Sequence, residues 1–230
     1  TAHRLGITDL RQGDCGPTIT LGACEVKQVD MAFAFSVLAN NGVMKGQELV
    51  VTDRKDPATR GLEPVALLKV TDADKKVLYE FKQPVERRVL PAEYVWLVTS
   101  ILSNGANQCI TYGVCNALSL PNGYPSAAKT GTSAPFDNPN LIGETWTMGY
   151  TPELVGGVWA GNADNAPIQG IDSTRFQPTK ANTTVTANST SVRAITPFTD
   201  IVRSPDAPTR SMFAAVNVCS LSICFDTGTS

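Results

Sequence analysis

The chain has 230 residues, of which 42% are hydrophobic and 17% charged, a balance typical of a globular domain rather than a disordered protein. Its formal net charge of -2 gives no basic field, which disfavours nucleic acid as a partner. No apolar run approaches the roughly 20 residues that a membrane-spanning helix requires. The chain starts at Thr1 without an initiator methionine or a signal peptide, so we expect a processed or incomplete piece of a longer protein.

Six cysteines occur as three pairs that are close in sequence: Cys15 and Cys24, Cys109 and Cys115, Cys219 and Cys224. None of these pairs has the CxxC spacing of a zinc site, and His3 is the single histidine, so we expect neither a metal nor a cofactor. Disulfides formed in an oxidising, extracytoplasmic compartment are favoured, with buried free thiols as the alternative. Many connectivities are open to six cysteines, and pairing of sequence neighbours is the simplest.

The first half of the chain predicts two helices and a hairpin. One helix has an apolar face with the spacing i, i+4, i+7, made by Met31, Phe35 and Leu38. We assign no chemistry to Asp30 in its first turn. Residues 44–62 are charged and irregular, which indicates a surface loop. A second helix opens at Pro91, and its apolar face would comprise Tyr94, Leu97, Val98 and Ile101.

Between these helices, residues 65–70 and 77–81 flank a polar turn and predict a β-hairpin. The turn contains Asp72 and Asp74, but no loop of further acidic ligands follows. A solvated turn is therefore favoured over a calcium site.

Residues 104–125 contain Cys109 and Cys115 and are rich in turn residues, so we expect a loop. Residues 126–133 then predict a strand that carries one lysine, two threonine hydroxyls and a glycine where a ligand can approach the backbone. A lysine among small and hydroxyl side chains suits an anion-binding site. The alternative is a surface strand whose lysine protects a sheet edge.

Ser126 and Lys129 also match the pattern Ser-x-x-Lys, in which a helix brings a serine and a lysine together. In a strand, residues three apart point to opposite faces, so these two side chains would not meet. Pro125 and Gly131 further disfavour a helix here. We therefore reject Ser126 as a nucleophile.

Residues 144–162 mix β-branched and aromatic residues with glycines around a turn at Thr151-Pro152-Glu153, and predict a second hairpin. Glu144 at its start is expected to make a supporting polar contact. Residues 162–192 are rich in Asn, Thr and Ser, which indicates a surface loop. Apolar residues at helical spacing then predict a helix over 194–203, followed by a tail at 204–230.

Lys129-Thr130-Gly131 and the hairpin after it resemble the third signature motif and following hairpin of class A (bifunctional) penicillin-binding proteins. The resemblance implies an α/β fold of the α+β type: a five-stranded antiparallel sheet flanked by helices, incomplete in this chain. The resemblance extends to the order of the predicted elements over residues 1–203, which would be the C-terminal half of a transpeptidase domain. Within that half, a hairpin insertion would span about 63–83 and a loop about 162–192, and 204–230 would be a separate cysteine-containing tail.

In that family, the nucleophilic serine belongs to Ser-x-x-Lys, and a Ser-x-Asn motif assists proton transfer. No Ser-x-Asn tripeptide occurs in this chain, so the resemblance places the nucleophile outside it. By the same resemblance, Lys129 supplies positive charge, and the hydroxyls of Thr130 and Thr132 bind the substrate carboxylate. The backbone N–H of Thr132 would donate a hydrogen bond to the oxyanion. Gly131, which has no side chain, would let the substrate lie close against this strand.

The function implied is part of a D,D-transpeptidase, an acyltransferase that cross-links peptidoglycan stem peptides through an acyl-serine and binds penicillin. Its partners would be the remaining N-terminal part of the domain, in the same or a separate chain, the stem peptide and β-lactams. It would act in the bacterial envelope outside the cytoplasm, with membrane contact only through a segment absent from this chain. One alternative is a non-catalytic, disulfide-stabilised accessory subunit on the same scaffold. A β-lactamase or β-lactam sensor is less favoured.

Overall fold

The computed structural model describes residues 1–8, 10, 15–48, 60–133, 138, 141–162, 164, 166–168 and 192–194. Its helices, including the short 3-10 helices labelled η, are α1 (Ala2–Leu5), η1 (Gly16–Leu21), α2 (Gln28–Ala39), α3 (Ala92–Ser103), η2 (Gly105–Asn107), α4 (Gln108–Tyr112) and η3 (Pro121–Gly123). Its strands are β1 (Val43–Gly46), β2 (Lys69–Thr71), β3 (Val77–Glu80), β4 (Val85–Arg88), β5 (Ala127–Ser133), β6 (Glu144–Tyr150), β7 (Val155–Gly161) and β8 (Val192–Ala194). No helix among these residues is long and apolar enough to cross a membrane.

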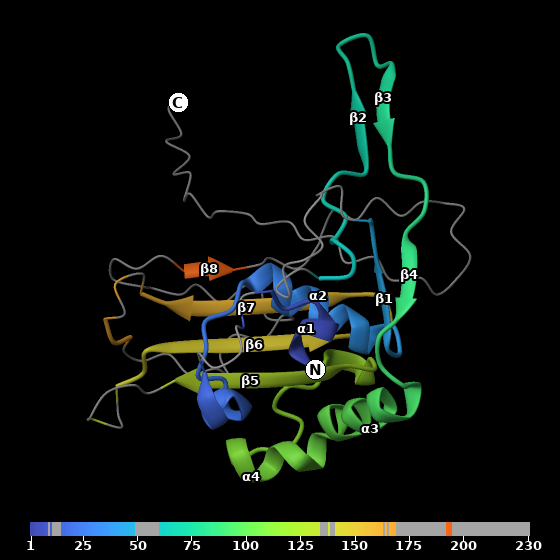
Figure 1. Cartoon of the computed structure of the whole chain (residues 1–230). Coiled ribbons are helices and arrows are strands. Elements are labelled where there is room, and N and C mark those ends of the chain that lie inside the picture. Colours follow the sequence, from blue (N-terminus) through green and yellow to red (C-terminus); the bar gives the residue numbers. More distant parts are fainter. Residues whose placement is uncertain are drawn as a thin grey trace, which may run out of the picture.

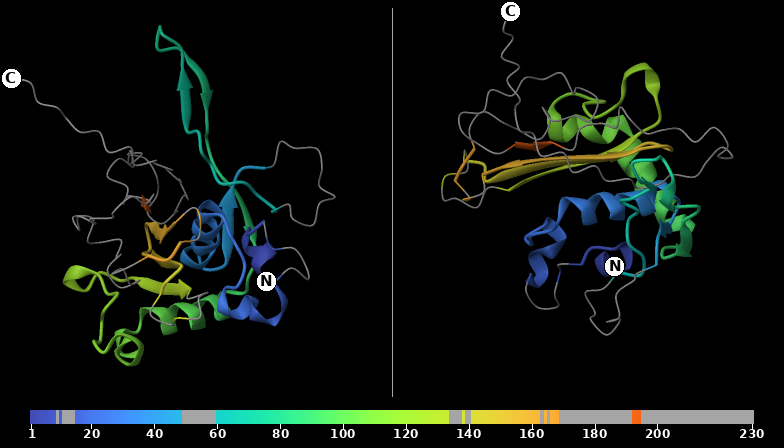
Figure 2. Two further views of the ribbon diagram at one scale, coloured as in Figure 1. Left: turned by 90° about the vertical axis from the view of Figure 1, so that its left-hand side faces the viewer. Right: turned by 90° about the horizontal axis from the view of Figure 1, so that it is seen from above.

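The main sheet has the order β5-β6-β7-β8, and every neighbouring pair is antiparallel (Figure 1). Helix α2 lies on one face of this sheet and α4 on the other (Figure 2). This arrangement confirms the predicted antiparallel sheet flanked by helices. The hairpin predicted over 144–162 is confirmed as β6 and β7. Strand β8 was not predicted, because Ala194 was assigned to a helix; residues 195–203 lie outside the described residues.

Helix α2 is buried on two sides. On the sheet side, the Phe35 ring meets the Tyr150 ring edge-on, with centroids 6.1 Å apart. On the opposite side, a fully buried cluster consists of Phe33, Val37, Met44 and Leu62. The prediction of a single apolar face was therefore incomplete, because an almost wholly apolar helix has no periodicity that distinguishes one buried side from two.

Strands β1 and β4 form a separate two-stranded pair, in which Val43 lies opposite Arg88 and Gly46 opposite Val85. Met44 of β1 and Leu62 are buried in the core described above. The prediction of a surface loop over 44–62 is wrong at these positions, and residues 49–59 lie outside the described residues. A short strand that contains a lysine and a glycine gives too little alternation to be recognised.

The predicted hairpin is confirmed as β2 and β3, which project away from the main sheet (Figure 1). In its turn, the Asp72 carboxylate accepts the backbone N–H groups of Asp74 and Lys76 at 3.0 and 2.9 Å. Asp72 thus closes the turn, as expected of a solvated turn of this kind.

Helix α3 follows Pro91, as predicted, but its apolar face is exposed. Val95 is buried, and the Thr99 hydroxyl hydrogen-bonds to the Tyr150 phenol at 2.7 Å. Burial raises the pKa of Tyr150, despite an opposing effect of the Thr99 hydrogen bond. The four residues expected to be packed are instead 39–65% exposed: Tyr94, Leu97, Val98 and Ile101. None of the described residues covers this face, and an uncovered apolar patch of this kind indicates an interaction surface.

Asp30 has a structural role that the sequence did not reveal. Its carboxylate is fully buried, accepts the Thr8 N–H and hydroxyl at 2.9 and 2.6 Å, and forms an ion pair with Arg60. Arg60 also pairs with Glu63 at 2.7 Å and lies 5.7 Å from the Phe33 ring centroid. Burial alone would lower the pKa of Arg60, but its hydrogen bond to Glu63 and the charge of Asp30 raise it.

By the native protein we mean this chain purified from its host together with any bound partner. We predict that Asp30→Ala lowers the free energy of unfolding of the native protein by about 3 kcal/mol. The substitution leaves the Arg60 charge largely buried, with Glu63 as its remaining counter-charge among the described residues. The measurement is the shift of the urea unfolding midpoint. Glu80→Ala is the control, because it removes an exposed ion pair to Lys69 and should cost less than about 1 kcal/mol. Equal shifts for the two variants would contradict the prediction.

Candidate substrate-binding strand

Strand β5 confirms the extended conformation expected for residues 126–133, and it lies at one end of the described four-stranded sheet. Opposite each other across β5 and β6 lie Lys129 and Met148, Gly131 and Trp146, and Thr132 and Thr145. Because side chains alternate along a strand, Lys129 and Gly131 belong to one face, and Thr130 and Thr132 to the other. The strand conformation also keeps Ser126 and Lys129 from sharing a helical turn.

The polar groups of β5 are turned in different directions. Gly143 donates its N–H to the Ser133 carbonyl at 2.9 Å, so the peptide groups of Ser133 face β6. Alternation along an antiparallel strand then directs the N–H of Thr132 and the carbonyl of Thr130 to the outer edge. Consistent with this, the Lys129 ammonium donates to the Thr130 carbonyl.

Packing does not require a glycine at position 131. A Cβ built there would lie 3.8 Å from the Trp146 Cβ, which is ordinary van der Waals contact, and its φ is not in the left-handed region. Gly157 differs, because a Cβ there would come within 2.2 Å of the Met148 sulfur. The described packing thus gives a reason for a glycine at position 157 of β7 but none for the glycine at position 131 of β5.

Glu144 joins the two tryptophans of the hairpin. Its carboxylate accepts the indole N–H of Trp159 at 2.6 Å and that of Trp146 at 3.4 Å. The two indole rings are edge-on, with centroids 6.5 Å apart. This is the supporting polar contact predicted for Glu144. It fixes the end of β6 that lies opposite Ser133.

Tyr112 is a contact of this strand that sequence reasoning missed. Thr130 is 8% exposed, and its hydroxyl shares a hydrogen bond with the Tyr112 phenol. Tyr112 is the last residue of α4, within the segment 104–125 that was expected to be a loop, so that expectation is wrong there. A helix as short as α4 has too few residues to show an apolar period.

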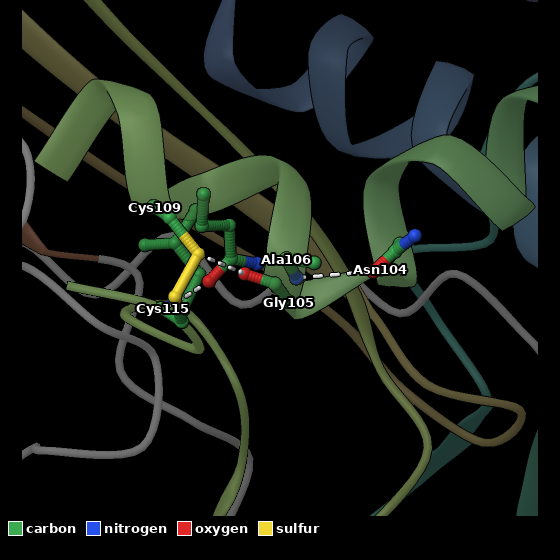
Figure 3. The surroundings of a disulfide bond; sticks show 7 residues. Asn104, Gly105, Ala106, Cys109 and Cys115 are labelled. Carbon is green, nitrogen blue, oxygen red and sulfur yellow. Dashed lines mark hydrogen bonds between the residues drawn. A yellow bond between two sulfur atoms is a disulfide. The ribbon is translucent and has the colours of Figure 1, made fainter. Parts of the chain in front are cut away.

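Two of the three expected disulfides lie among the described residues. Cys15 is bonded to Cys24, and Cys109 to Cys115, as pairing of sequence neighbours predicts. Figure 3 shows the second bond beside η2, where Asn104 accepts the Ala106 N–H at 3.0 Å. Cys219 and Cys224 lie outside the described residues. No group of three or more His, Cys, Asp or Glu residues that could hold a metal occurs in the described part of the chain.

The family described as the penicillin-binding protein transpeptidase domain matches residues 17–176. This match covers well over half of the chain, and the chain belongs to that family.

Curated relatives include penicillin-binding protein 2D of Bacillus subtilis, 26% identical over 186 residues, which are 78% of this chain and 22% of that protein. Penicillin-binding protein 1A of Mycobacterium tuberculosis is 28% identical over 163 residues, which are 70% of this chain and 17% of that protein. The chain therefore spans about a fifth of the length of these relatives.

Among solved structures, PonA1 of Mycobacterium tuberculosis, a penicillin-binding protein, is similar with a TM-score of 0.55 and 25% identity. The similarity covers 75% of this chain and 44% of that one. The PonA1 complex with penicillin V gives a TM-score of 0.53 and 26% identity, and covers 73% of this chain and 41% of that one.

We predict that Cys219 and Cys224 form the third disulfide of the native protein. Non-reducing peptide mapping by mass spectrometry should recover three linked peptide pairs, since the two described bonds leave these two cysteines as each other's remaining partners within the chain. The described bonds serve as internal controls for the digest. Free thiols at both positions, or a link to another polypeptide, would contradict this pairing.

Proposed function

We propose that this chain is the C-terminal part, residues 1–203, of a class A D,D-transpeptidase domain that cross-links peptidoglycan stem peptides, and that 204–230 is a tail. The observation that carries the proposal is strand β5, which carries Lys129 and the outward N–H of Thr132 at one end of the described sheet, in a chain of this family. The absence of a packing reason for Gly131 supports a ligand that lies close against the strand.

Each group of β5 has a proposed role in acyl transfer. A serine outside this chain attacks the carbonyl of the penultimate D-alanine, its proton is taken up by a base, and the terminal D-alanine leaves as the acyl-serine ester forms. Lys129 supplies positive charge at the site, and the hydroxyls of Thr130 and Thr132 donate to the substrate carboxylate. The outward N–H of Thr132 is one donor to the oxyanion of the tetrahedral intermediate.

The proposal requires another part of the domain that supplies the nucleophile, and it requires a location outside the cytoplasm. The exposed apolar face of α3 supports a partner, which we identify as the remaining N-terminal part of the domain, in the same or a separate chain. The two disulfides support an oxidising compartment, in the periplasm or on the outer face of the membrane. The same disulfides favour, to a lesser degree, the alternative of a non-catalytic accessory subunit on this scaffold.

We predict that a fluorescent penicillin labels the native protein covalently, and that Lys129→Ala slows acylation by about 100-fold because the site loses its positive charge. Gly131→Ala should also slow labelling while leaving the unfolding midpoint unchanged. Lys69→Ala is the control, because this lysine belongs to the distant hairpin and pairs with Glu80. The absence of an adduct with the unsubstituted protein would contradict the enzyme proposal and favour the accessory subunit.

We also predict that residues 1–230 expressed alone do not fold cooperatively, because the apolar face of α3 would stay in water. The measurement is thermal unfolding by circular dichroism at two protein concentrations. Replacing Leu97 and Ile101 by glutamate should increase the solubility of the isolated chain and weaken its association in the native protein. A soluble, monomeric 1–230 with a sharp unfolding transition would contradict the proposal that this chain needs the N-terminal part of the domain in order to fold.

A further inference from the structure

We propose that Tyr112 is a positioning residue for strand β5: its phenol donates to Thr130 Oγ1, which leaves the Thr130 hydroxyl proton to donate to an anionic ligand. The inference rests on the proposed function, because it concerns the same carboxylate-binding strand. It adds a residue that lies outside the Lys-Thr-Gly sequence.

Helix α4 carries Tyr112 to β5 through one face. Gln108 and Tyr112 lie at i and i+4, so they share a side of the helix, whereas Ile110 points away and is 95% exposed. Gln108 is buried, and its side-chain oxygen accepts the Leu118 N–H at 2.8 Å. Both polar residues of the inward face are therefore hydrogen-bonded.

The segment around α4 is tied together at several points. The disulfide between Cys109 and Cys115, drawn in Figure 3, closes a short loop of the chain, and Tyr112 is one of the residues within that loop. Asn116 donates its N–H to the Gly105 carbonyl at 3.1 Å, so the chain after the loop returns to η2. These links restrict where the phenol can go, and a residue held in this way can orient a neighbour without reorganising at each turnover.

Hydrogen-bond counting explains why this contact matters. A threonine hydroxyl has one proton and can accept two hydrogen bonds, and a tyrosine hydroxyl can also donate. When the phenol donates, the Thr130 oxygen is occupied as an acceptor and its own proton stays available. A hydroxyl that accepts one hydrogen bond becomes a better donor in the next, so the pair forms a short relay toward a carboxylate.

The alternative arrangement makes a different prediction. If Thr130 donated to Tyr112, the substrate carboxylate would have to break that bond, and removal of the phenol would speed up ligand binding. If Tyr112 acted only through packing, its hydroxyl would not matter, because phenylalanine retains the ring. The tyrosine-to-phenylalanine substitution therefore separates the three cases by the sign and selectivity of its effect.

The experiment measures second-order acylation rate constants of the native protein with a fluorescent penicillin that has its free carboxylate, and with the neutral methyl ester of that compound. We expect Tyr112→Phe to slow the free acid by about three- to tenfold, the size of one hydrogen bond, and to leave the ester unchanged. Thr130→Val should show the same selective loss, and the double variant should lose no more than Thr130→Val alone.

Tyr124→Phe is the matched control, because the phenol of Tyr124 is exposed and hydrogen-bonds to Glu153 in the turn between β6 and β7 rather than to Thr130. It should leave both rate constants unchanged. A variant with serine at both Cys109 and Cys115 should lose part of the preference for the free acid, and an unchanged preference would overturn the role of the disulfide.

The outcomes distinguish this inference from the proposed function. If the unsubstituted protein forms no adduct, the proposed function fails, and the inference fails with it. If the adduct forms and Tyr112→Phe changes neither rate constant, slows both equally, or accelerates the free acid, the positioning role is wrong while the proposed function stands.

Discussion

The register between β5 and β6 is the constraint on which the candidate site depends. A slip of one residue would exchange the faces of every side chain of β5, placing Lys129 where Thr130 lies. Strand β6 is held against such a slip near both of its ends. At one end Tyr150 contacts Phe35 and Thr99, and at the other Glu144 accepts hydrogen bonds from two tryptophans. The chemistry of β5 is thus positioned by contacts made on its neighbour.

Helix α2 connects this sheet to the rest of the described structure. Its sheet side carries Phe35, and its opposite side carries Phe33 against the buried Met44 and Leu62. The Asp30 carboxylate in its first turn binds Thr8 before the helix and Arg60 well after it. A buried charge of this kind contributes little net stability, but removing one partner is costly, so it favours this arrangement of the three segments over others.

Local patterns explain what the sequence could predict. Strands β5 to β7 were predictable because β-branched residues, glycines and a proline-containing turn follow one another within a short span. The role of Asp30 was not, since its partner Arg60 is distant in sequence and no local pattern joins them. Strand β1 and Tyr112 were missed for a related reason: each lies in an element too short to show a period, and its pairing is decided by long-range contacts.

Under the proposed function, one partner structure would contact both the exposed face of α3 and the outer edge of β5. Helix α3 packs beside β5, with Val95 buried and the Thr99 hydroxyl bonded to Tyr150 of β6, and turns Leu97 and Ile101 into solvent. A structure that covers these apolar side chains would therefore lie beside β5, which is at one end of the described sheet. Under the proposed function, the nucleophile must approach that same edge. Hydrophobic burial on α3 would then place the two halves of the site in register before any substrate binds.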